Sequence, residues 1–179
     1  MQTASPLPPD TPPAPAYDAL PRTADERTTL LTFLAWQRAT LGRKCEGLTR
    51  EQLRARSAPP STLSLIGLVR HLADVERGWF RRTLAGEQVA DRYSSETDTD
   101  GDFDNVDSAD VDEAFSAWRS ECALADAVIA QHSLDDIGRQ RTGREVSMRW
   151  ILVHMVEEYS RHNGHADLLR ERIDGATGY

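Results

Sequence analysis

One stretch near the C-terminus, residues 151–172, constrains the fold more than any other part of this 179-residue chain. Four polar side chains share one face of this stretch when it is read as a helix with 3.6 residues per turn: His154, Glu158, His162 and His165. Apolar residues lie on and beside that face, so it should point toward other helices. Burying a carboxylate and three imidazoles is costly unless they hydrogen-bond to one another or bind a cation. The four-residue spacing of Glu158 and His162 favours the cation, because such side chains lie one turn apart.

A second helix is expected to supply the remaining ligand. Residues 61–86 repeat apolar side chains at helical spacing, and His71, the only histidine before residue 132, stands beside that apolar stripe. A lone histidine there usually just hydrogen-bonds a carbonyl group. Together with Glu158 and His162, however, it completes three protein ligands and leaves a fourth position for water or substrate, which is typical of catalytic zinc. Nickel and iron accept the same ligands.

The remaining chain predicts two further long helices. One begins at the capping box Thr23–Glu26 and ends near Gly47, and the other begins at Ser108 or Asp110 and ends near His132. With residues 61–86 and the C-terminal stretch, they give an all-α four-helix bundle. A long crossover at 87–110 separates the second helix from the third, which favours an up-down-down-up course. No convincing strand is visible in the sequence.

The ends of these segments carry helix signals. A second capping box, Thr49–Gln52, predicts one short turn of helix before Pro59 and Pro60, and Ser61 or Thr62 should cap the second long helix. Ser147 should begin the last helix, and Gly175 should end it.

The first 21 residues hold seven of the nine prolines and almost no large apolar groups. Such a composition cannot bury enough surface to offset its ordering entropy, so residues 1–21 are expected to form a disordered arm. Residues 22–179 form the bundle domain in this interpretation.

Composition excludes several classes of function. A net charge of −8 opposes binding to nucleic acid, and no run of 18 apolar residues is available to span a membrane. The N-terminus lacks the order of a secretory signal, so a cytoplasmic location is expected. Cys45 and Cys122 lie in helical patterns without a CxxC motif, which predicts buried free thiols. A homodimer is a further expectation, because bundles with exposed Trp or Leu often dimerise.

Three groups of polar residues have a simpler explanation beside a functional one. The acidic segment 94–107 partly imitates a calcium loop, but its first and twelfth positions differ from that pattern, so a solvated crossover is expected. His154 and His165 are candidates for hydrogen bonds to the metal ligands or for the substrate side of the pocket, or they are simply half-exposed histidines. A hydrolase would need a general base, for which Asp74 or Glu157 is the nearby carboxylate.

The chain resembles the DinB-like superfamily of metal-binding four-helix bundles over residues 22–175. The segments that carry the resemblance are 59–80, with His71, and the helix 151–172. Within the superfamily the chain is similar to a bacterial branch catalogued as a domain of unknown function, also called mini-circle proteins. The superfamily's usual second ligand is histidine, whereas Glu158 stands here. That replacement is similar to the N-terminal domain of mycothiol-dependent maleylpyruvate isomerases, which implies His71, Glu158 and His162 as ligands.

The resemblance implies a metal-dependent S-transferase or isomerase that uses a low-molecular-weight thiol such as mycothiol. The metal would hold the thiol sulfur as a thiolate, which would attack a small electrophile. An arginine-rich chain with one lysine is compatible with an actinobacterial source. The alternative is a non-catalytic stress-response or ligand-binding module whose metal is structural or absent.

Overall fold

The computed structural model of the protein describes residues 17–178. The described residues form four long helices with short helices and one small hairpin between them. The elements in chain order are η1 (Tyr17–Ala19), α1 (Glu26–Cys45), α2 (Arg50–Arg54), α3 (Leu65–Glu76), η2 (Arg77–Leu84), α4 (Gly101–Asp104), α5 (Val111–Ala130), β1 (Ile137–Arg139), β2 (Glu145–Ser147) and α6 (Met148–Asp174). The expectation of an all-α fold is therefore confirmed.

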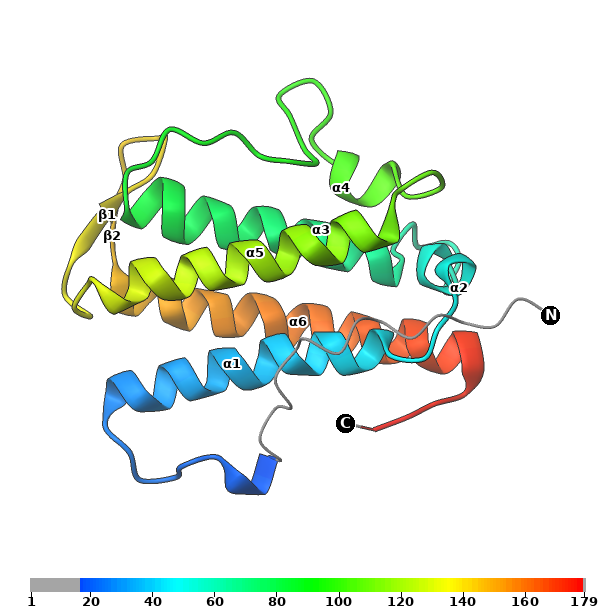
Figure 1. Ribbon diagram of the computed structural model, residues 1–179, viewed down its shortest axis with the longest axis horizontal. Helices are drawn as coiled ribbons and strands as arrows, with labels where there is room; N and C mark the ends of the chain where they lie inside the picture. The colour runs from blue at the N-terminus through cyan, green and yellow to red at the C-terminus, as the bar shows by residue number, and fades with distance from the viewer. Residues whose placement is uncertain (1–16, 179) are drawn as a thin grey trace.

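The long helices lie side by side, with α1 packed against α6 and α3 packed against α5 (Figure 1). In that view α1 and α6 run from left to right, whereas α3 and α5 run from right to left. Helix α3 also contacts α6, which brings the helix that carries His71 against the helix that carries Glu158 and His162. The segment between η2 and α5 returns along the length of the bundle and carries α4.

Helix termini follow the local signals with two exceptions. Ser147 caps α6, Gly175 ends it in the left-handed conformation with φ 79°, and the Thr49–Gln52 capping box is present at α2. The predicted caps of the first two long helices are wrong. Asp25, not Thr23, accepts the free amide of Thr28, and Ser64, not Ser61 or Thr62, caps α3 by accepting from the amide of Gly67.

The sequence suggested an irregular link after α5, but the structure has a small hairpin there. Strands β1 and β2 pair antiparallel, with Gly138 opposite Val146. Each strand has only three residues, which is too short for a period of two to be recognised. A side chain at Gly138 would lie 2.5 Å from the carbonyl oxygen of Thr83, so glycine is what allows the hairpin to rest on η2.

Residues 1–16 lie outside the described residues, so the disordered arm stays a prediction. From Tyr17 onward the chain lies on the bundle: the Tyr17 ring is 5.3 Å from the Trp36 ring, and Leu20 is buried. None of the helices in residues 17–178 combines the length and apolar character that crossing a membrane requires.

A polar network crosses the middle of the apolar core and takes one residue from each long helix. Arg38 donates two hydrogen bonds of 2.7 Å to the carboxylate of Glu76. The hydroxyl of Tyr159 also donates to Glu76 at 2.8 Å and accepts from the indole N–H of Trp118 at 2.8 Å. Both Glu76 and Tyr159 are fully buried, so these bonds compensate for groups that have lost water.

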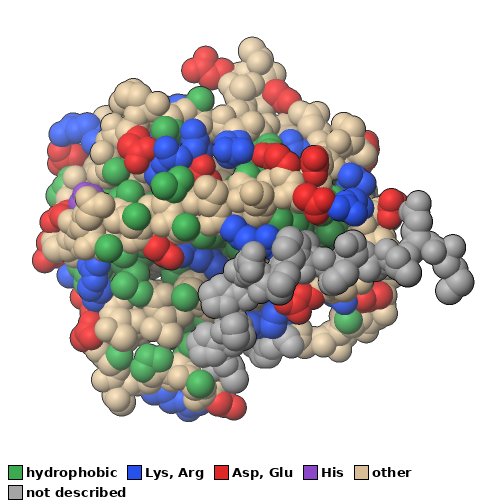
Figure 2. Space-filling view, viewed as in Figure 1, with side chains coloured by type: hydrophobic (Ala, Val, Ile, Leu, Met, Phe, Trp, Pro, Cys, Tyr) green, Lys and Arg blue, Asp and Glu red, His purple; other side chains and the backbone are tan. Residues whose placement is uncertain are grey.

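On the surface, acidic and basic side chains lie close together on the face drawn in Figure 2.

Candidate metal centre

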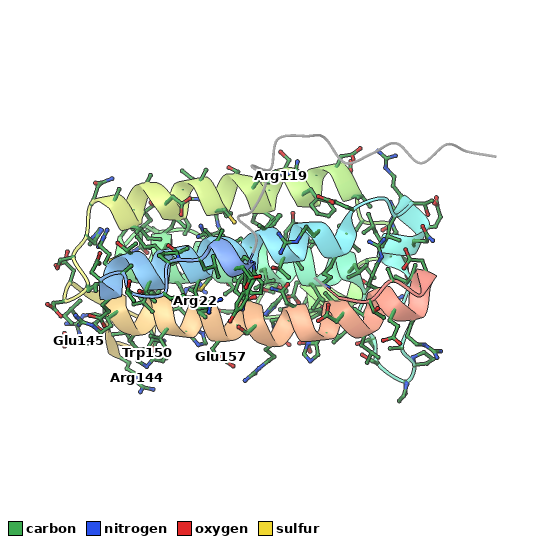
Figure 3. The ribbon with its side chains drawn as sticks, turned by 90° about the horizontal axis from the view of Figure 1, so that it is seen from below. Arg22, Arg119, Arg144, Glu145, Trp150 and Glu157 are labelled. Atoms are coloured by element: carbon green, nitrogen blue, oxygen red, sulfur yellow. The ribbon has the colours of Figure 1, made fainter. Side chains whose placement is uncertain are left out.

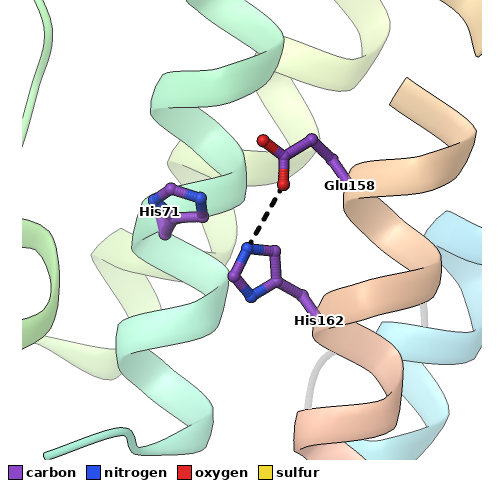
Figure 4. Close-up of side chains that lie close together, drawn as sticks. All are labelled: His71, Glu158 and His162. Carbon is purple, nitrogen blue, oxygen red and sulfur yellow. Dashed lines mark ion pairs between the residues drawn. The ribbon is translucent and has the colours of Figure 1, made fainter. Parts of the chain in front are cut away.

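The three residues expected to bind a metal lie together between α3 and α6 (Figure 4). His71 comes from the middle of α3, and Glu158 and His162 come from successive turns of α6. The ring centres of His71 and His162 are 4.7 Å apart, and Nε2 of His162 lies 3.4 Å from a carboxylate oxygen of Glu158. One ligand atom from each residue lies within 4.8 Å of those from the other two.

The donor set and its spacing fit a divalent ion. A tetrahedral ion with bonds of about 2.1 Å holds its ligand atoms about 3.4 Å apart, which is the separation of His162 and Glu158. Two imidazole nitrogens and one carboxylate oxygen suit zinc and its neighbours in the transition series. Because the group is small and polar, a divalent ion satisfies it better than an apolar or bulky ligand would.

The orientation of His71 is fixed by the crossover. Its Nδ1 lies 2.7 Å from Oδ2 of Asp102, which belongs to α4 and is buried. A neutral imidazole bonded to a carboxylate in this way carries its proton on Nδ1, which leaves Nε2 free to bind a cation. On the ring's flat side, Phe103 stacks at 4.7 Å. The crossover therefore supports the site and is not simply a solvated connection.

Sequence reasoning missed Asp102 and Phe103. Asp102 is one acidic residue among many in the crossover, so nothing in its local pattern separates it from its exposed neighbours. Phe103 carries the signal that could have found it, because it is the only aromatic side chain between residues 94 and 110. A large apolar side chain within a strongly acidic link indicates that this part of the link contacts the core.

The other two histidines of α6 lie on either side of this group. Nε2 of His154 is 3.6 Å from Glu158, and its ring contacts the indoles of both Trp79 and Trp150. Nδ1 of His165 is 3.4 Å from Nδ1 of His162. Both are half-buried and lie outside the group of His71, Glu158 and His162, although His154 forms a second possible metal-binding group with Glu157 and Glu158.

The electrostatic environment favours charge on Glu158 and opposes it on His165. The hydrogen bond from His162 lowers the pKa of Glu158, and the charges of His162, His154 and His71 act in the same direction. Burial lowers the pKa of His165, and the nearby His162 and Arg161 add to that effect. The site thus presents an ionised carboxylate to any cation held there, which is the protonation state that ligation requires.

Neither carboxylate considered as a general base is placed for that role. The oxygens of Asp74 accept hydrogen bonds from the backbone amides of Arg92, Tyr93 and Ser94, so they hold the start of the crossover. Glu157 pairs with Arg161 at 2.6 Å and lies on the outward side of α6 (Figure 3). In residues 17–178 the groups able to hold a metal include no member of the acidic segment 94–107.

The family comparison agrees with this geometry. A family model described as mycothiol-S-transferase matches residues 29–175, which is most of the chain. The chain belongs to the mycothiol-S-transferase family. The family is DinB-like, so the resemblance found in the sequence is confirmed. No curated protein matches the chain.

A member of the mycothiol-S-transferase family would need space for a substrate beside its metal ligands. A pocket of about 430 Å³ opens next to His71 and extends along η2 toward the β1–β2 hairpin. Its volume lies in the range of sites that hold small organic ligands, about 300–1,000 Å³. Of the three metal candidates, His71 is the one that lines this pocket.

The cysteines of this family member are free, as predicted, and are not activated as nucleophiles. Burial raises the pKa of Cys45 to about 12. Burial and the neighbouring carboxylate of Glu76 also raise the pKa of Cys122 far above its usual value. Neither thiol of the described chain is therefore readily ionised.

Proposed function

We propose that this protein is a metal-dependent mycothiol S-transferase that joins the thiol to a small electrophilic molecule. The observation that carries the proposal is the convergence of His71, Glu158 and His162 from two helices beside an open pocket. Three protein ligands leave a coordination position for a substrate, whereas a purely structural site is usually closed by four. Membership of the mycothiol-S-transferase family supports the choice of thiol.

Each site residue has a separate task in this proposal. His71, Glu158 and His162 would hold the divalent ion, with zinc as the expected metal and nickel or iron as alternatives. The ion, when bound, supplies the positive charge that lowers the pKa of a thiol beside it. Asp102 keeps the Nδ1 proton of His71 in place, and Phe103 keeps the imidazole ring from turning.

The reaction needs no nucleophile from the protein. The substrate thiol loses its proton to solvent, and its sulfur forms a bond to the electrophilic carbon of the second substrate. The leaving group departs with the electron pair of the bond that breaks. The chain contributes binding and orientation, because it holds the sulfur beside the electrophile.

The wider setting follows from the same proposal. We take the four long helices as an up-down-down-up bundle, which the helix directions in Figure 1 support. A cytoplasmic location suits a reaction that consumes reduced thiol, because the cytoplasm keeps thiols reduced.

Metal content and thiol consumption, measured on the same preparations, test the proposal. Purified protein should contain about one divalent ion per chain, and it should consume mycothiol in the presence of an electrophile such as monobromobimane. His162→Ala and Glu158→Gln should lose the ion and the activity together. His132→Ala is the matched control, because this histidine bonds the carbonyl of Val128 at the end of α5, away from the site.

Two outcomes would contradict the proposal. If His162→Ala lost the metal but still consumed thiol at the wild-type rate, the site would not be catalytic. If the wild-type protein bound metal with no displaceable position and no thiol transfer, the alternative of a non-catalytic binding module would replace it.

A further inference from the structure

We propose that the pocket beside His71 is a subsite for the uncharged, hydroxyl-rich part of the thiol substrate. The inference rests on the proposed function, and it identifies which residues recognise the thiol and by what chemistry. Mycothiol carries its cysteine on a sugar–cyclitol pair, and its cysteine is blocked at both ends, so the molecule has no carboxylate and no amine. A site for it needs neutral hydrogen-bonding groups and an apolar surface for the ring faces.

The walls of the pocket come from three parts of the chain that only the fold brings together. Trp79 and Arg82 project from η2, Thr99 comes from the crossover, and Gln140 and Thr142 come from the hairpin turn. His71 lies at the edge of the same space. A ligand that occupies it can therefore contact His71 with one end and the hairpin with the other.

The charged side chains that line the pocket already contact other groups of the protein. Arg82 pairs with Asp91 at 2.6 Å, and Arg141 also approaches Asp91, at 3.7 Å. The carboxylate of Asp102 is held by His71. Asp74, the remaining acid of the lining, accepts three backbone amides.

Because of these contacts, the pocket should discriminate between charged and uncharged thiols. A peptide thiol such as glutathione presents two carboxylates, and each would need a cation that is not already paired. Arg82 could bind such a ligand only by leaving Asp91. Arg141, which is exposed and approaches the same carboxylate at 3.7 Å, would have to bind the ligand's carboxylate beside the negative charge of Asp91. An uncharged thiol requires no such exchange, so the pocket favours it.

Neutral groups remain available for hydroxyls. The side chains of Thr99, Gln140 and Thr142 have no hydrogen-bond partner within residues 17–178, although each lines the pocket. They offer two hydroxyls and one amide, which both donate and accept and thus match the hydroxyl groups of a sugar. The indole of Trp79 is half-buried and supplies a flat apolar surface on which the C–H face of a sugar ring can pack.

Titration calorimetry with a sulfur-free fragment tests the subsite separately from the chemistry. The probe is N-acetylglucosaminyl-inositol, which is uncharged and cannot bind a metal through sulfur. It should bind the full chain with the same affinity before and after the metal is removed with a chelator. S-methylglutathione, in which the sulfur is blocked, should bind at least tenfold more weakly, an effect on the order of one lost charge-assisted hydrogen bond.

Substitutions at the hairpin turn identify the contact residues. Gln140→Ala combined with Thr142→Ala should weaken fragment binding by about tenfold, since each side chain contributes roughly one hydrogen bond. The same variant should raise KM for mycothiol and leave kcat near the wild-type value. Arg144→Ala is the control, because this side chain is exposed on the same hairpin, points away from it in Figure 3 and does not line the pocket.

The outcomes separate this inference from the proposed function. Fragment binding that is unchanged in the Gln140/Thr142 variant, or S-methylglutathione that binds as tightly as the fragment, would overturn the subsite. Metal-dependent transfer in a protein that does not bind the fragment would also overturn it while leaving the proposed function intact. Conversely, if the protein bound the fragment but had no transfer activity, the subsite would stand and the proposed enzymatic function would be refuted.

Discussion

Asp102 differs from the other acidic residues of the crossover in what it contacts. Its carboxylate is buried and bonded to Nδ1 of His71, whereas most of its neighbours face solvent. Replacing it with alanine should weaken metal binding by about 10–100-fold, because His71 would lose both its preferred tautomer and its orientation. Competition against a chromophoric chelator measures the affinity, and ¹⁵N NMR of the histidine rings reports the tautomer directly.

The control for this substitution lies two residues away. Asp104→Ala removes a carboxylate of the same short helix that is exposed to solvent, so metal affinity should stay at the wild-type value. A similar loss in both variants would indicate that the negative charge of the crossover matters and the hydrogen bond to His71 does not.

The two cysteines allow a second prediction at the scale of single residues. Because burial raises the pKa of both thiols, neither should react with Ellman's reagent in the native protein at pH 8, and both should react after unfolding. Cys122 is partly exposed as a residue, but its sulfur lies 3.7 Å from the Glu76 carboxylate, which opposes ionisation. Rapid labelling of Cys122 in the folded state, with loss of transfer activity, would contradict the assignment of an external nucleophile.

At the scale of elements, α4 depends on the absence of a side chain at its first residue. A Cβ atom on Gly101 would lie 2.5 Å from the carbonyl oxygen of Tyr93 and 2.6 Å from a carboxylate oxygen of Asp98. Gly101→Ala should therefore displace the crossover and reduce the free energy of unfolding by about 1–3 kcal/mol. Metal affinity should fall too, because Asp102 moves with the displaced segment. Denaturant unfolding and chelator competition measure the two effects.

Gly164 provides the matched control for that substitution. It lies in α6 close to the metal candidates, but nothing stands within 4 Å of the position of its Cβ. Alanine is the better helix former, so Gly164→Ala should stabilise the protein by about 0.5–1 kcal/mol and leave metal affinity unchanged. Equal destabilisation by both substitutions would refute the steric explanation for Gly101.

The elements differ in how far the sequence determines them. Long helices were predictable because their apolar spacing repeats over several turns and because Ser147 and Gly175 mark the ends of α6. The hairpin was not, since three-residue strands carry no readable period. Nor was α4, which packs on α3 through contacts between residues that lie about thirty positions apart, such as Arg70 with the carbonyl of Gly101.

The same distinction holds for the candidate site. His71, Glu158 and His162 were identified because helical geometry places them on inward faces before any tertiary contact is known. Asp102 reaches the site from the short helix α4 within the crossover, and Thr99 and the hairpin residues line the neighbouring pocket from loops and turns, so their positions depend on packing. A sequence pattern therefore indicates the ligands of such a site more readily than the groups that orient them or that bind the substrate.

At the scale of the whole molecule, the core joins its four long helices through charge as well as apolar contact. Arg38 and Glu76 are almost completely withdrawn from solvent, and Tyr159 and Trp118 complete the hydrogen bonds around the carboxylate. Removing two charges from water costs several kcal/mol each, so this pair contributes to stability only while both partners and their hydrogen bonds are present.

Glu76→Leu should lower the free energy of unfolding by about 3–5 kcal/mol, because the buried guanidinium of Arg38 loses two hydrogen bonds and keeps its bond to the exposed Asp126. Arg38→Met combined with Glu76→Leu should lose much less than the sum of the two single variants, since no uncompensated charge remains. Breaking the exposed Asp18–Arg22 pair with Asp18→Ala should change stability little. Urea unfolding of the four variants gives the coupling energy, and strict additivity would show that the buried pair is not what joins the helices.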